Sequence, residues 1–125
     1  MDNVRIGYVS SIDYKSGTVQ ILYKDRDNSV TDDIPVLTMN GEYSMPAIND
    51  MVLVLHLSNG GEMGVVMGTF WNDSNKPSES GKEIYRKDFS KDGAAFMKYD
   101  KDKKTLYLHA DKIILENDSK KVNAL

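Results

Sequence analysis

The two histidines are the first residues to consider as reactive groups, because the chain contains no cysteine. His56 lies inside the apolar run 51–57 (MVLVLHL), a setting typical of a buried structural histidine rather than of a catalytic base. The absence of cysteine excludes disulfides and thiolate metal sites. The sequence also lacks a Gly-x-Ser-x-Gly nucleophile elbow and a phosphate-cradling glycine loop. We therefore expect no catalytic residues, no cofactor and no enzymatic activity.

His109 is the residue that could hold a metal ion. In a three-fold assembly each copy would place one His109 at the same height, and three imidazoles around an axis can bind a metal. The alternation of residues 105–110 opposes this, because Leu106, Leu108 and Ala110 share one face and His109 lies on the other. If the leucines face the axis, His109 points outward. We expect no bound metal.

Two acidic stretches begin like calcium-binding loops: Asp25-x-Asp27-x-Ser29 and Asp100-x-Asp102. An EF-hand loop needs glycine at position six and glutamate at position twelve. In the first stretch valine occupies both positions, and in the second threonine and aspartate occupy them. We interpret both stretches as solvated turns.

Aromatic side chains near the N-terminal strands could stack nucleic-acid bases, as in single-strand-binding barrels. Such proteins add a basic groove, whereas the basic residues here are interleaved with aspartates. The net charge is −3 and the sequence pI is about 5.3, the wrong sign for an affinity that depends on phosphates. The pattern favours core packing or subunit contact, and we expect no nucleic-acid partner. The aromatic residues concerned are Tyr8, Tyr23, Phe70 and Trp71.

The elements that must position these residues fit within 125 residues, enough for one domain and an appendage. Hydrophobic residues make up 40% and charged residues 28%, as in ordinary soluble proteins. No apolar run approaches the roughly 20 residues of a membrane span. The N-terminal residues lack the pattern of a signal peptide, so we expect synthesis in the cytoplasm.

The first half of the chain predicts five short strands. Residues 4–12 and 18–24 alternate with period two around a turn at 15–17, and predict a hairpin. A polar loop at 25–31 and a third strand at 32–37 follow. A second hairpin is predicted from strands 51–57 and 63–70, with a turn at 58–61. The connection 38–50 reads as irregular, with no substantial helix.

Closing these strands into a small barrel removes the exposed edges that five short strands would present. We predict an all-β protein with a five-stranded OB-type Greek-key barrel at residues 1–72, in which the usual helix is replaced by the loop at 38–50. Gly64 and Gly68 lie on one face, where glycine permits close backbone approach or a sharp bend. The residues assigned to barrel packing or subunit contact are Tyr8, Tyr43, Gly64, Gly68 and Trp71.

The remaining chain divides into a polar linker at 73–90 and a tail at 91–125. Alternating runs at 94–99, 105–110 and 112–116 predict short strands, and residues 118–125 are expected to fray. A lone hairpin is at best marginally stable in water, and nothing in the sequence covers the apolar side of this tail. We therefore expect identical copies of the tail to cover one another in an oligomer.

Several motifs, in order, resemble a known family. They are Gly7-x-Val9 in the first strand, Tyr43-x-x-Pro46 before the fourth, and Gly64-Val65-Val66-x-Gly68 in the last. With Asp92-Gly93-Ala94 and Tyr99-Asp100 in the tail, residues 4–116 resemble phage baseplate assembly protein V. This is the central spike of contractile tails, related to VgrG-type secretion spikes and contractile bacteriocins.

The resemblance implies a homotrimer in which three barrels form a collar and three tails wind into a β-prism or β-helix. Such a spike plugs the tail tube, binds a baseplate hub protein above the barrel, and pierces the target cell envelope. It would be made in the bacterial cytoplasm and assembled into a virion or a phage-tail-like particle. The residues expected to face the trimer axis are Phe96, Leu106, Leu108, Ala110, Ile113 and Leu115.

The chain departs from the family at its end. Longer members carry a His-x-His motif that holds iron, whereas this chain has Leu108-His109-Ala110 and a short tail. A separate tip-capping protein is therefore expected in place of an iron tip. The alternative function is a single-stranded nucleic-acid-binding OB protein. An enzyme subunit or carbohydrate-binding module ranks last, because the sequence shows no convergent polar cluster.

Overall fold

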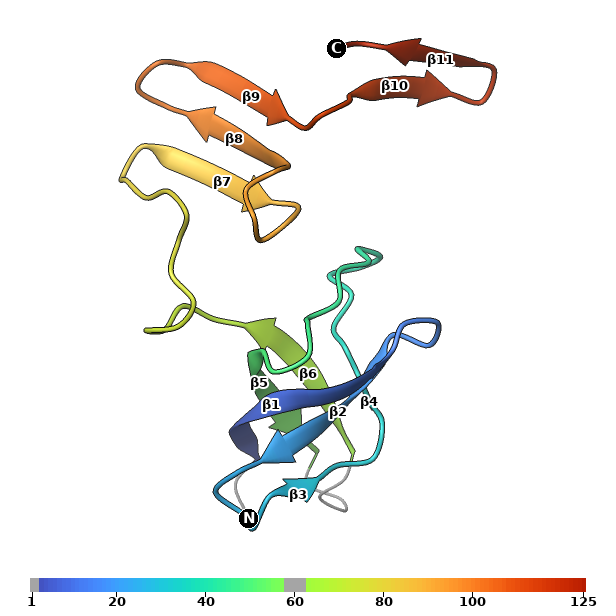
Figure 1. The fold of residues 1–125 in the computed structure, drawn as a ribbon, viewed down its shortest axis with the longest axis vertical. Helices are drawn as coiled ribbons and strands as arrows, with labels where there is room; N and C mark the ends of the chain where they lie inside the picture. Colours follow the sequence, from blue (N-terminus) through green and yellow to red (C-terminus); the bar gives the residue numbers. More distant parts are fainter. Residues whose placement is uncertain (1–2, 58–62) are drawn as a thin grey trace. The chain divides into compact units, whose positions relative to one another are not determined.

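The computed structural model describes residues 3–57 and 63–125, and in these residues it contains eleven strands and no helix. The predicted all-β class is confirmed. The chain divides into two units, Met1–Asn75 (unit 1) and Lys76–Leu125 (unit 2) (Figure 1). The turn predicted at 58–61 lies outside the described residues.

Unit 1 is one antiparallel sheet with the strand order β3-β2-β1-β5-β6, and β4 also pairs with β2. Both predicted hairpins are present, β1 with β2 and β5 with β6. The connection between β4 and β5 is irregular, as predicted. The strands are β1 (Val4–Asp13), β2 (Thr18–Tyr23), β3 (Ser29–Val30), β4 (Ile34–Pro35), β5 (Met51–His56) and β6 (Gly64–Thr69).

The predicted third strand at 32–37 corresponds to β4, which is only two residues long, and an unpredicted short strand, β3, precedes it. Asp27 and Asn28 both adopt φ of 56°, which turns the chain back so that β3 forms within the predicted polar loop. Thr31 separates β3 from β4, and its hydroxyl accepts a hydrogen bond from the Ile21 amide at 3.0 Å. The strand β4 ends at Pro35, which cannot donate to a ladder.

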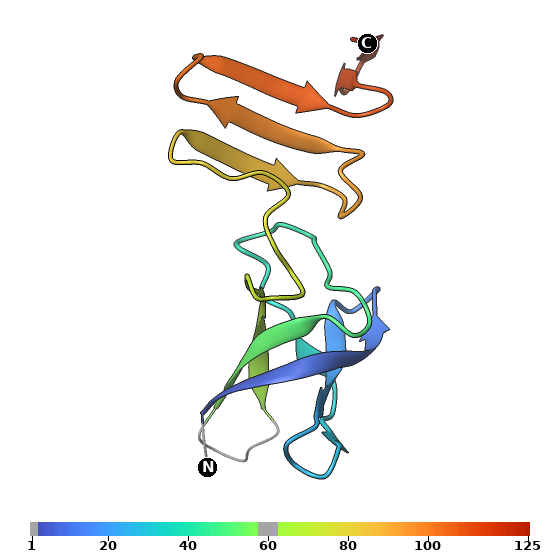
Figure 2. The ribbon, with the colours of Figure 1, turned by 60° about the vertical axis from the view of Figure 1, so that its left-hand side comes forward.

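The strand pairings of unit 1 close into a ring. Beyond β4, Val36 forms a parallel bridge with Val66 of β6. The Leu37 amide donates to the Val66 carbonyl at 2.9 Å, and the Val36 amide donates to the Gly17 carbonyl at 2.9 Å. The path β1-β2-β4-β6-β5 therefore returns to β1, and the turned ribbon shows the strands of unit 1 curving around a common interior (Figure 2).

The core of the protein lies inside this ring. Alternate residues of β2 point inward, as its period-two pattern predicts, and alternate residues of the apolar strand β5 are buried as well. The interior is therefore built from aliphatic side chains and one tyrosine. The buried hydrophobic residues are Val9, Val19, Ile21, Tyr23, Ile34, Val52, Val54 and Val66.

Each of the two glycines of β6 is required for a different structural reason. A Cβ on Gly64 would lie 2.6 Å from the Leu55 carbonyl oxygen, so the backbones of β5 and β6 approach too closely for another residue. At Gly68 the register shifts and Met67 has no partner, which makes a β-bulge. Gly68 has a φ of +127°, a conformation that disfavours side chains.

Unit 2 consists of a three-stranded sheet, β7-β8-β9, and a separate hairpin, β10-β11. The predicted strands at 94–99, 105–110 and 112–116 correspond to β8, β9 and β10 with boundaries shifted by one or two residues. The strands are β7 (Ile84–Asp88), β8 (Phe96–Asp100), β9 (Thr105–His109), β10 (Ile114–Asn117) and β11 (Lys120–Asn123).

Two predictions for this part of the chain are wrong. Strand β7 lies inside the predicted linker 73–90, because three of the five residues of IYRKD are charged and resemble a polar loop. Strand β11 lies in the segment expected to fray. A turn in which the Ser119 amide donates to the Asn117 side chain at 2.9 Å joins it to β10. The Ala124 amide then donates to the Ile113 carbonyl at 2.8 Å and anchors the chain end.

Unit 2 has no core of its own. All of residues 76–125 are described, and every one of them is at least partly accessible to solvent. All the buried hydrophobic residues of the described chain belong to unit 1. Strand pairing without a buried interior gives little stability in water. The apolar side chains of unit 2 thus lie on surfaces of the single chain.

Candidate functional site

The register of β7, β8 and β9 sorts the side chains of unit 2 onto two faces. Directly paired residues share a face, and the pairs include Phe96 with His109 and Met97 with Leu108. One face, here called the braced face, carries Arg86, Asp88, Phe96, Lys98, Tyr107 and His109. The other, the apolar face, carries Tyr85, Lys87, Met97, Tyr99, Leu106 and Leu108.

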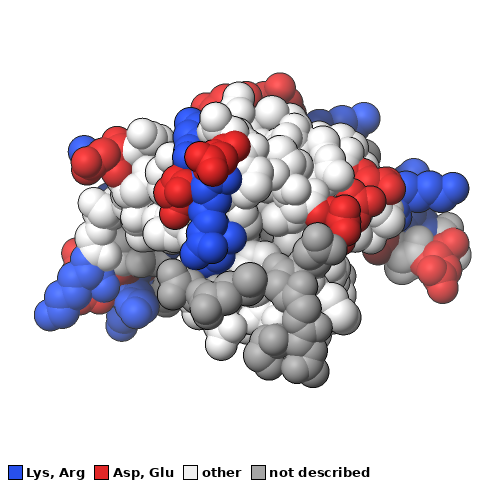
Figure 3. Space-filling model, turned by 90° about the horizontal axis from the view of Figure 1, so that it is seen from below, with Lys and Arg blue, Asp and Glu red and all other residues white. Residues whose placement is uncertain are grey.

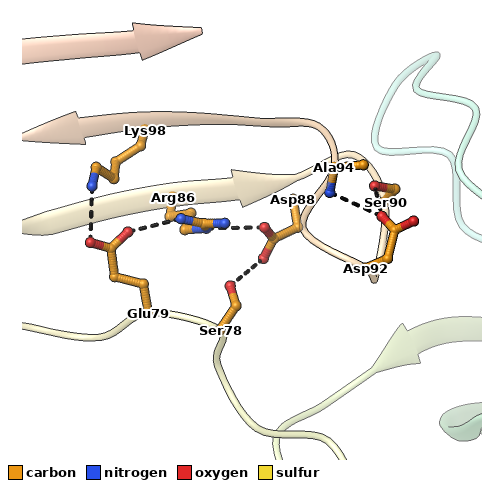
Figure 4. A network of polar contacts seen from close by, with 8 residues as sticks. All are labelled: Ser78, Glu79, Arg86, Asp88, Ser90, Asp92, Ala94 and Lys98. Atoms are coloured by element: carbon orange, nitrogen blue, oxygen red, sulfur yellow. Dashed lines mark hydrogen bonds and ion pairs between the residues drawn. The ribbon is translucent and has the colours of Figure 1, made fainter. Parts of the chain in front are cut away.

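A polar segment that precedes β7 covers the braced face. The Glu79 carboxylate accepts hydrogen bonds from Arg86 and from Lys98, both at 2.9 Å, and so joins β7 to β8 (Figure 4). Arg86 also donates to Asp88 at 3.0 Å, and the Ser78 hydroxyl donates to Asp88 at 3.0 Å. Residues 78–79 therefore hold the charged side chains of this face in place.

Aromatic rings complete the braced face. The Arg86 guanidinium lies 3.7 Å from the centre of the Phe96 ring. The His109 ring stacks on Phe96, with 4.7 Å between centroids and 17° between planes. The Lys98 ammonium lies 4.6 Å from the centre of the Tyr107 ring. Cation–π and stacking contacts satisfy these side chains within a single copy.

Removal of the Glu79 charge tests this brace. Hydrogen bonds from Lys98 and Arg86 lower the pKa of the Glu79 carboxyl. A carboxyl whose pKa is lowered on folding stabilises the fold above its ordinary pKa of about 4.3, and that stabilisation is lost as the pH falls through the lowered value. We expect Glu79→Gln to lower the melting temperature of unit 2 at neutral pH but not in acid. Thermal melts followed by near-ultraviolet circular dichroism measure this.

The matched control is Glu83→Gln, which removes the same charge from an exposed position in the same segment. It should leave the melting temperature unchanged at both pH values. An equal loss in both variants would show that net charge, rather than the brace, sets stability.

The apolar face is uncovered in the single chain. Tyr85 is 55% exposed, Tyr99 37%, Leu106 62% and Leu108 51%. Lys87 is the single charged residue on this face among the paired residues of the sheet. A contiguous exposed apolar surface on a folded sheet is typical of a protein-protein contact.

The register separates Phe96 from two of the other residues predicted to face a trimer axis, Leu106 and Leu108. The prediction grouped Phe96 with Leu106 and Leu108, but the register pairs Phe96 with His109 and so places it on the braced face. Alternation within one strand does not reveal how two strands are aligned. Tyr85, Met97 and Tyr99 lie beside the leucines instead.

The other predicted axis residues, Ala110, Ile113 and Leu115, come after β9 in the chain. Ala110 and Ile113 line a shallow cleft with Phe89 and Phe96 at the end of β9. Leu115 lies in β10 opposite Val122 of β11, so both point to one side of the hairpin. Sequence analysis missed Val122, because KKVN was taken as part of a frayed end.

No group of three or more His, Asp or Glu side chains that could hold a metal ion occurs in the described parts of the chain. His109 lies on Phe96, on the face opposite Leu106 and Leu108, as its alternation predicts.

Of the aromatic residues that the sequence analysis names in unit 1, Tyr23 lies in the buried core, whereas Tyr8, Tyr43 and Trp71 lie outside it. Tyr43 and Trp71 are exposed, and the Tyr43 hydroxyl donates to the Tyr14 carbonyl at 3.0 Å. Tyr8 is half-buried, with the Lys24 ammonium 4.1 Å from its ring centre. These three side chains therefore lie outside the buried core, and Gly64 and Gly68 serve the β5–β6 pairing.

His56 belongs to a buried polar contact of unit 1, as its apolar run predicts. Its Nε2 lies 2.5 Å from the Tyr23 hydroxyl, and the Arg5 guanidinium lies 3.6 Å from the Tyr23 ring centre. Burial raises the pKa of the Tyr23 hydroxyl, and the Arg5 charge partly offsets that effect. The arrangement is that of a hydrogen-bonded core pair.

The charged residues of the chain are mixed in sign. On the face drawn in Figure 3, Lys and Arg side chains of the described residues lie next to Asp and Glu side chains, with uncharged surface between them. A continuous basic groove, the usual feature of a phosphate-binding surface, is not seen on that face among those residues.

The chain matches none of the known protein-family models, and a search of curated proteins gives no significant match. No helix in the described residues has the length and hydropathy to cross a membrane.

Proposed function

We propose that this protein is a structural spike component, the homotrimeric central spike of a contractile phage tail or a related injection particle. The observation that carries the proposal is the exposed apolar face of a sheet in a unit without a buried residue. Three copies that turn this face toward a common axis supply the missing core. The apolar side chains then leave water, at roughly 25 cal/mol per Å² buried.

The braced face supports this orientation. Its charges and rings are paired within one chain, so it suits the solvent-facing side of a trimer. The apolar face has a single charge and suits the inner side. Three such sheets around an axis form a triangular β-prism, the arrangement that the resemblance in the tail implies.

The ring of strands in unit 1 supports an OB-type barrel as the collar. In that topology the first strand pairs with the second and the fourth, and the third closes on the fifth. The β4 segment and its parallel bridge from Val36 to Val66 fill the role of the third strand. Exposed Tyr43 and Trp71 then provide contacts to neighbouring subunits or to a baseplate hub protein.

The mechanism of such a spike is mechanical. Interlocked sheets resist bending, because yielding would break many backbone hydrogen bonds together. On sheath contraction the trimer transmits force to the target cell envelope. The assembled trimer is part of a virion or phage-tail-like particle.

Sedimentation equilibrium of the full chain tests the assembly. The expected mass is three times the 14.1 kDa of one chain, and a stable monomer at micromolar concentration overturns the proposal. Electron microscopy of purified particles with an antibody against the chain tests the location. Label is expected at the baseplate end of the tail, and label elsewhere contradicts the spike assignment.

A further inference from the structure

Four strand edges of unit 2, the outer edges of β7, β9, β10 and β11, have no strand partner in the described chain. The sheet order β7-β8-β9 leaves the outer edge of β9 without a partner in the described chain. The hairpin β10-β11 is a separate sheet with both outer edges unpaired there. Open edges favour pairing with another chain, and a two-stranded hairpin gains stability from a third strand.

Charge distinguishes the edges that are protected from those that are not. Lysine on an outer strand discourages pairing, and β11 carries Lys120 and Lys121. At the other end of the sheet, β7 carries Arg86 and Lys87. By contrast, β9 (TLYLH) has no Lys, Arg, Asp or Glu, and β10 (ILEN) has only Glu116.

The single chain does not join its own β9 to its own β10. Ile113, which precedes β10, is half-buried and lines the cleft at the end of β9 with Phe89, Phe96 and Ala110. No strand of the described chain pairs with the outer edge of β9, so this edge is open to a strand of a different copy.

Resting on the proposed trimer, we propose that strand β10 of one copy pairs with the free edge of β9 in the next copy. The result is a composite sheet, β7-β8-β9 from one chain and β10-β11 from its neighbour. Leu115 and Val122 then continue the apolar surface of Leu106 and Leu108, and the lysine-bearing β11 becomes the outer edge.

The hairpin geometry shows which amide groups would make this contact. A two-residue turn joins Asn117 and Lys120, so they form a hydrogen-bonded pair, and the pairs alternate from there. The bond from the Ala124 amide to the Ile113 carbonyl agrees with that alternation. The backbone of Glu116 accordingly faces the outer edge of β10, and that of Lys121 faces the outer edge of β11.

Cross-linking tests the pairing, since the chain has no native cysteine. Full chains with Leu106→Cys are co-expressed with full chains with Leu115→Cys and treated with a short bis-maleimide. Its reach should cover the roughly 4.5–8 Å between opposed and diagonal residues of neighbouring strands. Peptide mass spectrometry should identify a Leu106→Cys to Leu115→Cys link between two chains.

Two proline variants test whether the cross-link depends on backbone pairing, because proline removes an amide donor. Glu116→Pro on the Leu115→Cys chain should lower the yield of that link by about tenfold, since it removes a donor from the pairing edge. Lys121→Pro removes a donor from the opposite edge and should leave the yield unchanged. Both variants lose the same exposed Glu116–Lys121 ion pair, 3.5 Å long, so that pair cannot explain a difference.

The outcomes separate this proposal from the trimer itself. A trimer by sedimentation that gives no such link, or equal yields in the two proline variants, overturns the strand pairing and leaves the spike proposal intact. A monomer overturns both.

Discussion

Leu108→Lys is expected to convert the proposed homotrimer into monomers. Leu108 lies on the apolar face and is 51% exposed in one chain, so lysine there does not disturb the fold of that chain. In the trimer each lysine would be buried against apolar side chains without a partner. If each buried charge costs about 3 kcal/mol, three copies cost about 9 kcal/mol, or roughly six orders of magnitude in association constant. Sedimentation equilibrium measures the change.

The matched control is Tyr107→Lys, which places the same charge one residue away on the opposite face of the same strand. It loses the contact between the Tyr107 ring and the Lys98 ammonium but should remain trimeric. If Tyr107→Lys dissociates the assembly and Leu108→Lys does not, the faces have been assigned in reverse, and the proposed axis is wrong.

Gly7→Ala is expected to destabilise unit 1 by about 2–4 kcal/mol. A Cβ at this position would lie 2.4 Å from a methyl carbon of Ile21 and 2.7 Å from the Tyr23 ring. Both side chains are fully buried, and Tyr23 is also hydrogen-bonded to His56, so neither has free space to enter. Urea denaturation followed by far-ultraviolet circular dichroism measures the loss, in a transition separate from that of unit 2.

Gly17→Ala provides the control for backbone strain alone. Gly17 has a φ of +72°, but an added Cβ meets no atom within 4 Å. Its expected cost is about 1–2 kcal/mol from the left-handed conformation. A Gly7→Ala loss no greater than that of Gly17→Ala would mean that the core tolerates the extra carbon.

The hairpins of unit 1 could be predicted because β2 alternates, β5 is an apolar run, and each hairpin joins segments that are close in the sequence. The additional strand β3 could not. Its form depends on φ of 56° at Asp27 and Asn28 and on a Thr31 side chain that replaces a backbone partner. The sequence offers no periodic signal for either feature.

The candidate site was predicted in part for a similar reason. The alternation of β9 correctly separates Leu106 and Leu108 from His109, because it lies within one strand. The position of Phe96 depends on how β8 aligns with β9, which is a non-local property. Strand β7 was missed because Arg86 and Lys87 look like linker residues. The role of Arg86 depends on its hydrogen bond to Glu79, a residue outside the strand, which the sequence of the strand does not reveal.

None of residues 76–125 is buried in the single chain, so in the proposed trimer the stability of unit 2 would depend on protein concentration. Unit 1, by contrast, carries its own core. A newly made chain would then hold a folded unit 1 and a weakly stable unit 2 until it binds its partners. Unit 2 would become rigid only in a complete set of subunits, which ties the stiffness of the proposed spike to its stoichiometry.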